Sequence, residues 1–191
     1  MQTEVFDPKD LAHWRSWLKE NHTTKDSVWL VFYTKASGKN VISWSEAVDQ
    51  ALCFGWIDSK KIKIDEETSH QYFSKRKAKS TWSKINKDKI ERLIDENLMA
   101  PAGLEIIEIA KQNGSWNLLD EVEQLIVPED LDKALKANPG AEEYFLNLSK
   151  STRKFMLTWI LFAKRPETRQ KRINEIAEHA ARGEKPKMFQ G

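Results

Sequence analysis

Glycine, cysteine and long apolar runs are all scarce in this sequence. Gly accounts for 7 of 191 residues, roughly half the usual share of ~7%, which favours long helices over tight hairpins. Cys53 is the only cysteine, so no disulfide forms within the chain, and the polar, acidic start from Met1 to Pro8 does not resemble a signal peptide. Both features predict a cytoplasmic protein. The longest apolar run, 155–163, is too short for a membrane span, which takes ~20 helical residues.

The composition is that of a folded globular protein. Charged residues make up 31% of the chain and hydrophobic residues 40%, which is too apolar for a disordered chain and too polar for a membrane protein. A chain of this length buries roughly 70% of its unfolded surface, so it needs neither a disulfide nor a metal to hold a core. We expect a single domain, 1–191, with an N-terminal α/β lobe at about 1–80 and a helical lobe at about 81–185.

The formal net charge of +2 conceals two opposed blocks. Residues 75–92 carry eight basic and two acidic side chains, a net charge of +6. Residues 120–143 carry eight acidic and two basic side chains, a net charge of −6. Such blocks either pair within the fold or form separate patches, and the sequence leaves both possibilities open.

Apolar patterning predicts an α+β fold. Strands are expected at 28–33, 56–64 and 71–75, with a hairpin turn at 65–68. Helices are expected to open at Asp7-Pro8 and at the capping box Ser43-Trp-Ser-Glu46. The expected architecture is a small antiparallel or mixed sheet with two helices in the N-terminal part, and a helical C-terminal half packed against it.

The second half of the chain reads as a series of helices. One begins at the Ser80–Ser83 caps and another at Pro101, and the segment 151–164 is apolar nearly all round and should form the central helix. In the last helix Arg169 shares the inward stripe of Ile173 and Ile176. Such an arginine usually lies half-buried and bonds to a carboxylate or to carbonyl groups.

One cluster of candidate functional residues lies around the helix that ends near Phe54. Glu46, Asp49 and Cys53 share one helical face, and Asp58 follows the helix. The carboxylates could hold a hard cation or pair with basic side chains. A nucleophilic thiol is disfavoured, because Cys53 lies near a helix C-terminus and beside carboxylates, which both oppose the thiolate.

A second cluster interleaves basic and aromatic residues at a helix start. The segment 72–86 contains Arg76, Lys77 and Lys79, followed by the hydroxyl-bearing turn Ser80–Ser83. A helix N-terminus flanked by such cations is suited to an anion, a phosphorylated ligand or a nucleic-acid backbone. The alternative is a capped helix with a solvated basic loop. The sequence pI near 8.5 is below the value above 9 that is typical of nucleic-acid domains.

No metal, cofactor or catalytic residue is predicted. The four histidines make no HxH or HExxH spacing, and there is no glycine-rich phosphate loop and no G-x-S-x-G elbow. An enzyme is therefore the less favoured class, and it would need a carboxylate acid–base pair that uses Glu46 or Asp49.

Several segments resemble the YdeI/OmpD-associated family, which is also labelled a bacteriocin-protection family. They include Ala51-Leu-Cys-Phe-Gly-Trp-Ile-Asp58, Ser80-Thr-Trp-Ser83, Met99-Ala-Pro-Ala-Gly103, Val127-Pro-Glu-Asp-Leu131 and Pro166-Glu-Thr-Arg169 followed by Arg172-Ile173. The likeness extends over about 5–185. It implies tolerance of bacteriocins or membrane-active peptides, and it implies no catalytic residues.

Together these observations predict a non-enzymatic binding protein for a small anionic ligand or a protein partner. Its site would lie where the helix end near Phe54 meets the segment 75–86. The candidate ligand-binding residues are Glu46, Asp49, Cys53, Trp56, Asp58, Arg76, Trp82, Ser83 and Asn86. Nucleic-acid binding through 75–92 is the alternative that the sequence leaves open beside the enzyme.

The eight tryptophans divide into two groups by position. Trp14, Trp29, Trp44 and Trp159 fall on apolar faces and are expected in the core. Trp56, Trp82 and Trp116 fall at element ends within the family-like motifs, where a ligand would be sought.

Overall fold

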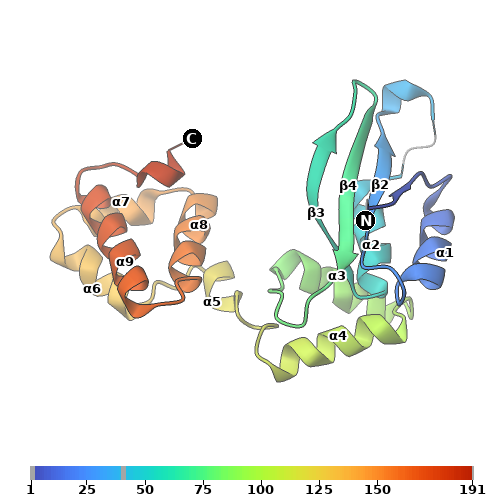
Figure 1. The fold of residues 1–191 in the computed structure, drawn as a ribbon. Helices are drawn as coiled ribbons and strands as arrows, with labels where there is room; N and C mark the ends of the chain where they lie inside the picture. Colours follow the sequence, from blue (N-terminus) through green and yellow to red (C-terminus); the bar gives the residue numbers. More distant parts are fainter. Residues whose placement is uncertain (1–2, 40–41, 191) are drawn as a thin grey trace. The chain divides into compact units, whose positions relative to one another are not determined.

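A computed structural model describes residues 3–39 and 42–190. The chain divides into two compact units, Met1–Leu118 and Leu119–Gly191, which we call the first and second units and describe separately. The first unit combines a sheet with helices and the second is helical, so the predicted α+β class with a helical C-terminal half is confirmed (Figure 1). The single-domain organisation stays a prediction.

The sheet of the first unit has four strands in the order β1-β2-β4-β3. Its strands are β1 (Val5–Phe6), β2 (Ser27–Tyr33), β3 (Trp56–Lys63) and β4 (Thr68–Lys75). β1 runs parallel to β2, whereas β4 is antiparallel to both of its neighbours. The predicted β3–β4 hairpin and the β2 strand are confirmed, and the two-residue β1 is an addition that the sequence pattern did not reveal.

The two faces of the sheet have different environments. Alternate residues such as Val28 and Phe73 face the core, where the helices α1 (Leu11–Asn21) and α2 (Trp44–Cys53) cover that face (Figure 1). Trp29, which we expected in the core, lies on the opposite face. There it packs edge-on against Tyr72 with their ring centroids 5.0 Å apart, because strand residues alternate between faces.

Helix boundaries follow the caps closely. Asp10 caps α1, accepting from the His13 amide at 2.7 Å, so α1 starts three residues later than Pro8, where the Asp7-Pro8 signal placed it. Ser43 caps α2 as predicted, accepting from the Glu46 amide. Trp44 was expected in the core but is 52% exposed, because it stands in the first turn of α2.

Two further helices complete the first unit. They are α3 (Lys84–Asp95), capped by Ser83, and α4 (Pro101–Gln112), which has Pro at its start as predicted. α4 packs so closely on the end of α2 that a Cβ at Gly103 would lie 2.2 Å from the carbonyl oxygen of Cys53. The close approach therefore requires glycine at this position.

The second unit consists of short helices around its own core. The helices are α5 (Asp120–Glu123), α6 (Glu129–Ala137), α7 (Ala141–Asn147), α8 (Lys150–Leu161) and α9 (Pro166–Ala181). The segment predicted as a central helix forms α8, but its Phe155 is 66% exposed, so α8 is not buried all round. Arg169 forms a two-point ion pair with Asp130, at 2.7 and 2.9 Å, as its position in the inward stripe predicted.

Residues of each charge block form ion pairs with oppositely charged residues of the same unit. In the acidic block, Glu123 pairs with Lys154 and Asp130 with Arg169. In the basic block, Lys89 and Arg92 both bond to Asp49. Much of the +6 and −6 charge is therefore compensated locally.

No helix among residues 3–39 and 42–190 is both long enough and apolar enough to cross a membrane.

Candidate functional site

Arg76 is the best-buried charged side chain at the meeting point of α2, β4 and the loop before α3. Its backbone amide donates to the carbonyl of Gly55 at 2.9 Å, which ties the end of β4 to the turn that follows α2. Its side chain is only 6% exposed. The guanidinium carbon lies over the Trp82 ring, 3.6 Å from the centroid, and Nη1 donates to the carbonyl of Thr81 at 2.8 Å.

The charge of Arg76 is poorly compensated. Burial lowers the pKa of Arg76 to about 10, with the nearby charge of Asp58 acting in the opposite direction. Among the described residues no carboxylate lies within ion-pair distance of the guanidinium, and the buried Nε has no hydrogen-bond partner. Unpaired buried donors of this kind are costly, so they mark a strained or functional position.

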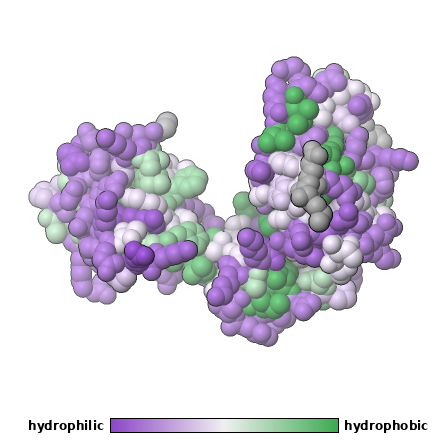
Figure 2. Space-filling model, in the orientation of Figure 1, coloured by the Kyte–Doolittle hydropathy of each residue, from purple (hydrophilic) through white to green (hydrophobic). Residues whose placement is uncertain are grey.

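A hollow of about 290 Å³ opens beside this arginine, and we call it the Arg76 hollow. Its polar lining is His22, Thr23, Lys75, Arg76 and Glu105, and its apolar lining is Phe54, Ala102, Ile106 and Ile109, with Gly55 between them. Apolar residues gather on the surface over α4, the helix that supplies the two isoleucines (Figure 2). The hollow combines an apolar wall with a buried cation, a pattern common to sites for small organic anions.

Asp58 lies within the electrostatic reach of Arg76 but does not line the hollow. Its Oδ2 accepts hydrogen bonds from Trp44 Nε1 at 3.0 Å and from Gln71 Nε2 at 3.2 Å. Burial raises the pKa of Asp58, while the hydrogen bond from Trp44 and the charge of Arg76 act against that rise. Asp58 is thus a half-buried carboxylate held by neutral donors.

Two of the predicted acidic residues on α2 have different surroundings. Asp49 faces α3 and is bonded by Lys89 and Arg92, whereas Glu46 is exposed on α2. Within 3–39 and 42–190, no group of three or more His, Cys, Asp or Glu side chains is placed to hold a metal ion. The Asp49 carboxylate is therefore already paired with two cations of α3.

Five other predicted residues belong to the framework around the hollow. Cys53 is fully buried, and burial raises the pKa of its thiol. Trp56 and Trp82 are packed in the core. Ser83 accepts from the amide of Asn86 at 3.4 Å and caps α3, so this pair sets the direction of the helix that follows Trp82.

Of the nine predicted site residues, Arg76 is the one that lines the hollow. The residues that sequence reasoning missed come mainly from α4, far along the chain, and include Glu105 and Ile106. The helical periodicity of α4 gives no sign of which face meets the end of α2. Lys75 and Gly55 stood within noticed segments, but only the fold brings them to one hollow.

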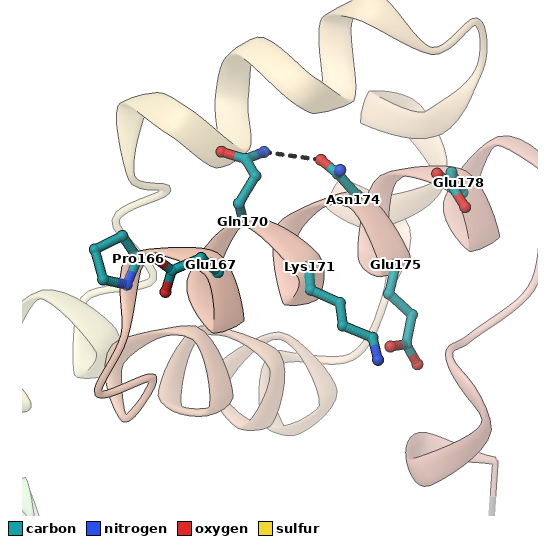
Figure 3. Close-up of a pocket in the computed structure, with 7 residues that line it drawn as sticks. All are labelled: Pro166, Glu167, Gln170, Lys171, Asn174, Glu175 and Glu178. Carbon is teal, nitrogen blue, oxygen red and sulfur yellow. Dashed lines mark hydrogen bonds between the residues drawn. The ribbon is translucent and has the colours of Figure 1, made fainter.

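Another shallow depression runs along the exposed side of α9 in the second unit (Figure 3). It is lined from a single helix by Pro166, Glu167, Gln170, Lys171, Asn174, Glu175 and Glu178. Gln170 bonds to Asn174 at 2.8 Å, and Lys171 is the one basic residue among three glutamates of this lining. Because its groups do not converge and none is an unpaired buried charge, this surface does not compare with the Arg76 hollow as a site.

Comparison with known proteins divides the chain at nearly the same place as the structure does. Residues 6–106 match the family described as "Domain of unknown function (DUF8412)", and residues 124–183 match the family described as "Bacteriocin-protection, YdeI or OmpD-Associated". The motif 51–58 thus lies in the first match and the motif 166–173 in the second, so the second family's match is shorter than the likeness seen over 5–185. Searches of curated proteins and of solved structures found no match. The chain belongs to the DUF8412 family, whose model covers more than half of it, and its second unit carries the YdeI/OmpD-associated region that the sequence motifs indicated.

Proposed function

We propose that the protein binds a small organic anion in the Arg76 hollow and acts as a binding protein rather than through a catalytic carboxylate. We propose the cytosol as the place of binding. The single cysteine is buried and has no second cysteine to pair with, and disulfides are typical of oxidising compartments outside the cytosol.

One observation carries the proposal. Arg76 is a nearly buried cation on the wall of a hollow, with an orphaned Nε and no carboxylate within ion-pair distance among the described residues. Removing a charge from water costs several kcal/mol unless a partner compensates it. An anion in the hollow would supply that partner, and the planar guanidinium fork is suited to carboxylate and phosphate oxygens.

The nucleic-acid alternative has less support from the same contacts. In the basic segment 75–92, Lys75, Lys84, Lys89 and Arg92 each lie within ion-pair distance of a carboxylate of the first unit. A phosphate backbone would have to compete with those pairs. Nucleic-acid affinity depends on cations that can release counterions from the phosphates.

Calorimetric titration of the full chain with benzoate and with inorganic phosphate tests the proposal. We expect saturable binding of at least one of these anions, and loss of that binding by about tenfold or more in Arg76→Met. Arg92→Met is the matched control, since this exposed arginine lies outside the hollow and should leave binding unchanged. Equal affinity in the wild type and in Arg76→Met, or no binding of either anion, would contradict the proposal.

A second candidate function rests on the match of residues 124–183 to a family described by bacteriocin protection. We propose that the full chain raises the tolerance of bacteria to bacteriocins. Survival curves of a sensitive strain with and without the expressed chain test it. Unchanged survival at matched expression would count against it, independently of the Arg76 hollow.

A further inference from the structure

We infer that the Arg76 hollow is selective for a monoanionic carboxylic acid with an apolar body, and that Glu105 excludes anions of higher charge. This inference rests on the proposed function and specifies its ligand class.

The apolar part of the ligand follows from the apolar members of the lining. Phe54, Ile106 and Ile109 supply carbon surface to the hollow. Ile106 on α4 is only partly buried against the core, so part of its side chain remains open to the hollow. Burial of apolar area is worth roughly 25 cal/mol per Å², so an acid with a ring or a branched chain gains affinity that acetate cannot.

The single negative charge follows from the balance of the polar lining. Lys75 Nζ already donates to the carbonyl of Thr23 at 2.8 Å and pairs with Asp26 at 3.3 Å. Arg76 is therefore the one cation of the lining without a carboxylate partner among the described residues. Because it supplies only one unit of positive charge, it compensates one carboxylate and not a dianion.

Glu105 acts against a second negative charge. Glu105 is an exposed carboxylate on the same lining, and like charges a few ångströms apart repel. His22 directs Nδ1 at the carbonyl of Leu18, at 2.9 Å. Since a carbonyl only accepts, Nδ1 carries the proton there and is already engaged by the backbone.

Four probes that share a ring or a charge separate these contributions. They are benzoate, acetate, phenyl phosphate and benzyl alcohol, titrated calorimetrically into the full chain near neutral pH. We expect benzoate to bind at least about tenfold more tightly than acetate. Phenyl phosphate, largely a dianion at this pH, should bind about tenfold more weakly than benzoate, and benzyl alcohol should bind most weakly of the three ring compounds.

Two variants test whether Glu105 and Ile106 cause the selectivity among these probes. Glu105→Gln should bring phenyl phosphate to within about threefold of benzoate while leaving benzoate nearly unchanged, because the repelled charge is removed. Ile106→Ser should reduce the preference for benzoate over acetate, and Ile94→Ser, an exposed isoleucine on α3 outside the hollow, is the matched control.

The outcomes distinguish the two levels of the account. If phenyl phosphate binds as tightly as benzoate in the wild type, or if Glu105→Gln leaves their ratio unchanged, the inferred selectivity is overturned while anion binding stands. If benzyl alcohol binds as tightly as benzoate, or if no anion binds, the proposed function itself fails.

Discussion

The guanidinium of Arg76 stacks on the indole of Trp82 at 3.6 Å and is almost fully buried, yet its Nε meets no hydrogen-bond acceptor among the described residues. Cation–π contact offsets part of the cost of burying a charge. It does not replace the oxygen acceptors that the donors lose on leaving water. Under the proposed function, these two residues form a platform for the anion, which supplies the missing counter-charge.

This incompleteness predicts an unusual effect of Arg76→Met on stability. Replacing a buried, unpaired charge by an apolar side chain of similar length is often neutral or stabilising. We expect the free energy of unfolding of Arg76→Met, measured by urea denaturation without anions, to equal or exceed that of the wild type by up to about 2 kcal/mol. A free energy of unfolding below that of the wild type would instead mark Arg76 as a residue required by the fold.

The Asp49 carboxylate is expected to be structural, in contrast to Glu46 one turn earlier. Asp49→Asn removes the charge partner of half-buried Lys89 and should lower the free energy of unfolding by about 2 kcal/mol. Glu46→Gln, at an exposed position, should change it by less than about 0.5 kcal/mol. Chemical denaturation of both variants checks this contrast, and similar values for the two would contradict it.

The raised pKa of Asp58 predicts a pH dependence with a definite sign. Because the folded state holds this proton more tightly than the unfolded state does, the resulting stability is fully present below the ordinary Asp pKa and is lost as the pH rises through the raised pKa. In Asp58→Asn, whose amide oxygen still accepts from Trp44, that dependence disappears.

Urea denaturation from about pH 3 to about pH 7 measures the effect. The wild-type free energy of unfolding minus that of Asp58→Asn should fall as the pH rises through this window and then level off. A difference that rises with pH would show that the carboxylate is stabilised in its ionised form instead.

Gly103 predicts a reversal of the usual effect of glycine in a helix. Gly→Ala within a helix ordinarily adds up to about 1 kcal/mol of stability. At this position the new methyl would lie 2.2 Å from the carbonyl oxygen of Cys53, so α4 must move away from α2. We expect Gly103→Ala to lower the thermal unfolding midpoint by several degrees, corresponding to about 2 kcal/mol or more. An unchanged or higher midpoint would mean that α4 does not pack this closely.

The sequence predicted the fold better than it predicted the site. The apolar stretch that forms β2 and the caps Ser43 and Ser83 act locally, and each was visible as a short pattern. Trp44 was misplaced because helical periodicity identifies a face but not whether a neighbouring element covers it.

The hollow was predictable only in part, for a related reason. Arg76 stood in a recognisable cationic and aromatic segment, and the expected meeting of that segment with the end of α2 occurs through the bond from the Arg76 amide to Gly55. Glu105 and Ile106 reach the same place through the packing of α4 on α2. That packing depends on the close contact between Gly103 and the carbonyl of Cys53. No local sequence pattern predicts a contact between residues this far apart in the chain.

The most direct test of the central claim is an NMR titration that follows the side-chain Nε–Hε resonance of Arg76 as benzoate is added to the full chain, with the signal assigned by its absence in Arg76→Lys. The account predicts that this resonance shifts progressively and saturates together with the backbone amides of Gly55 and Ile106, while the resonance of Arg169 in the second unit stays fixed. A titration in which benzoate leaves the Arg76 resonance unmoved, or in which Arg169 shifts as much as Arg76, would contradict anion binding in the hollow.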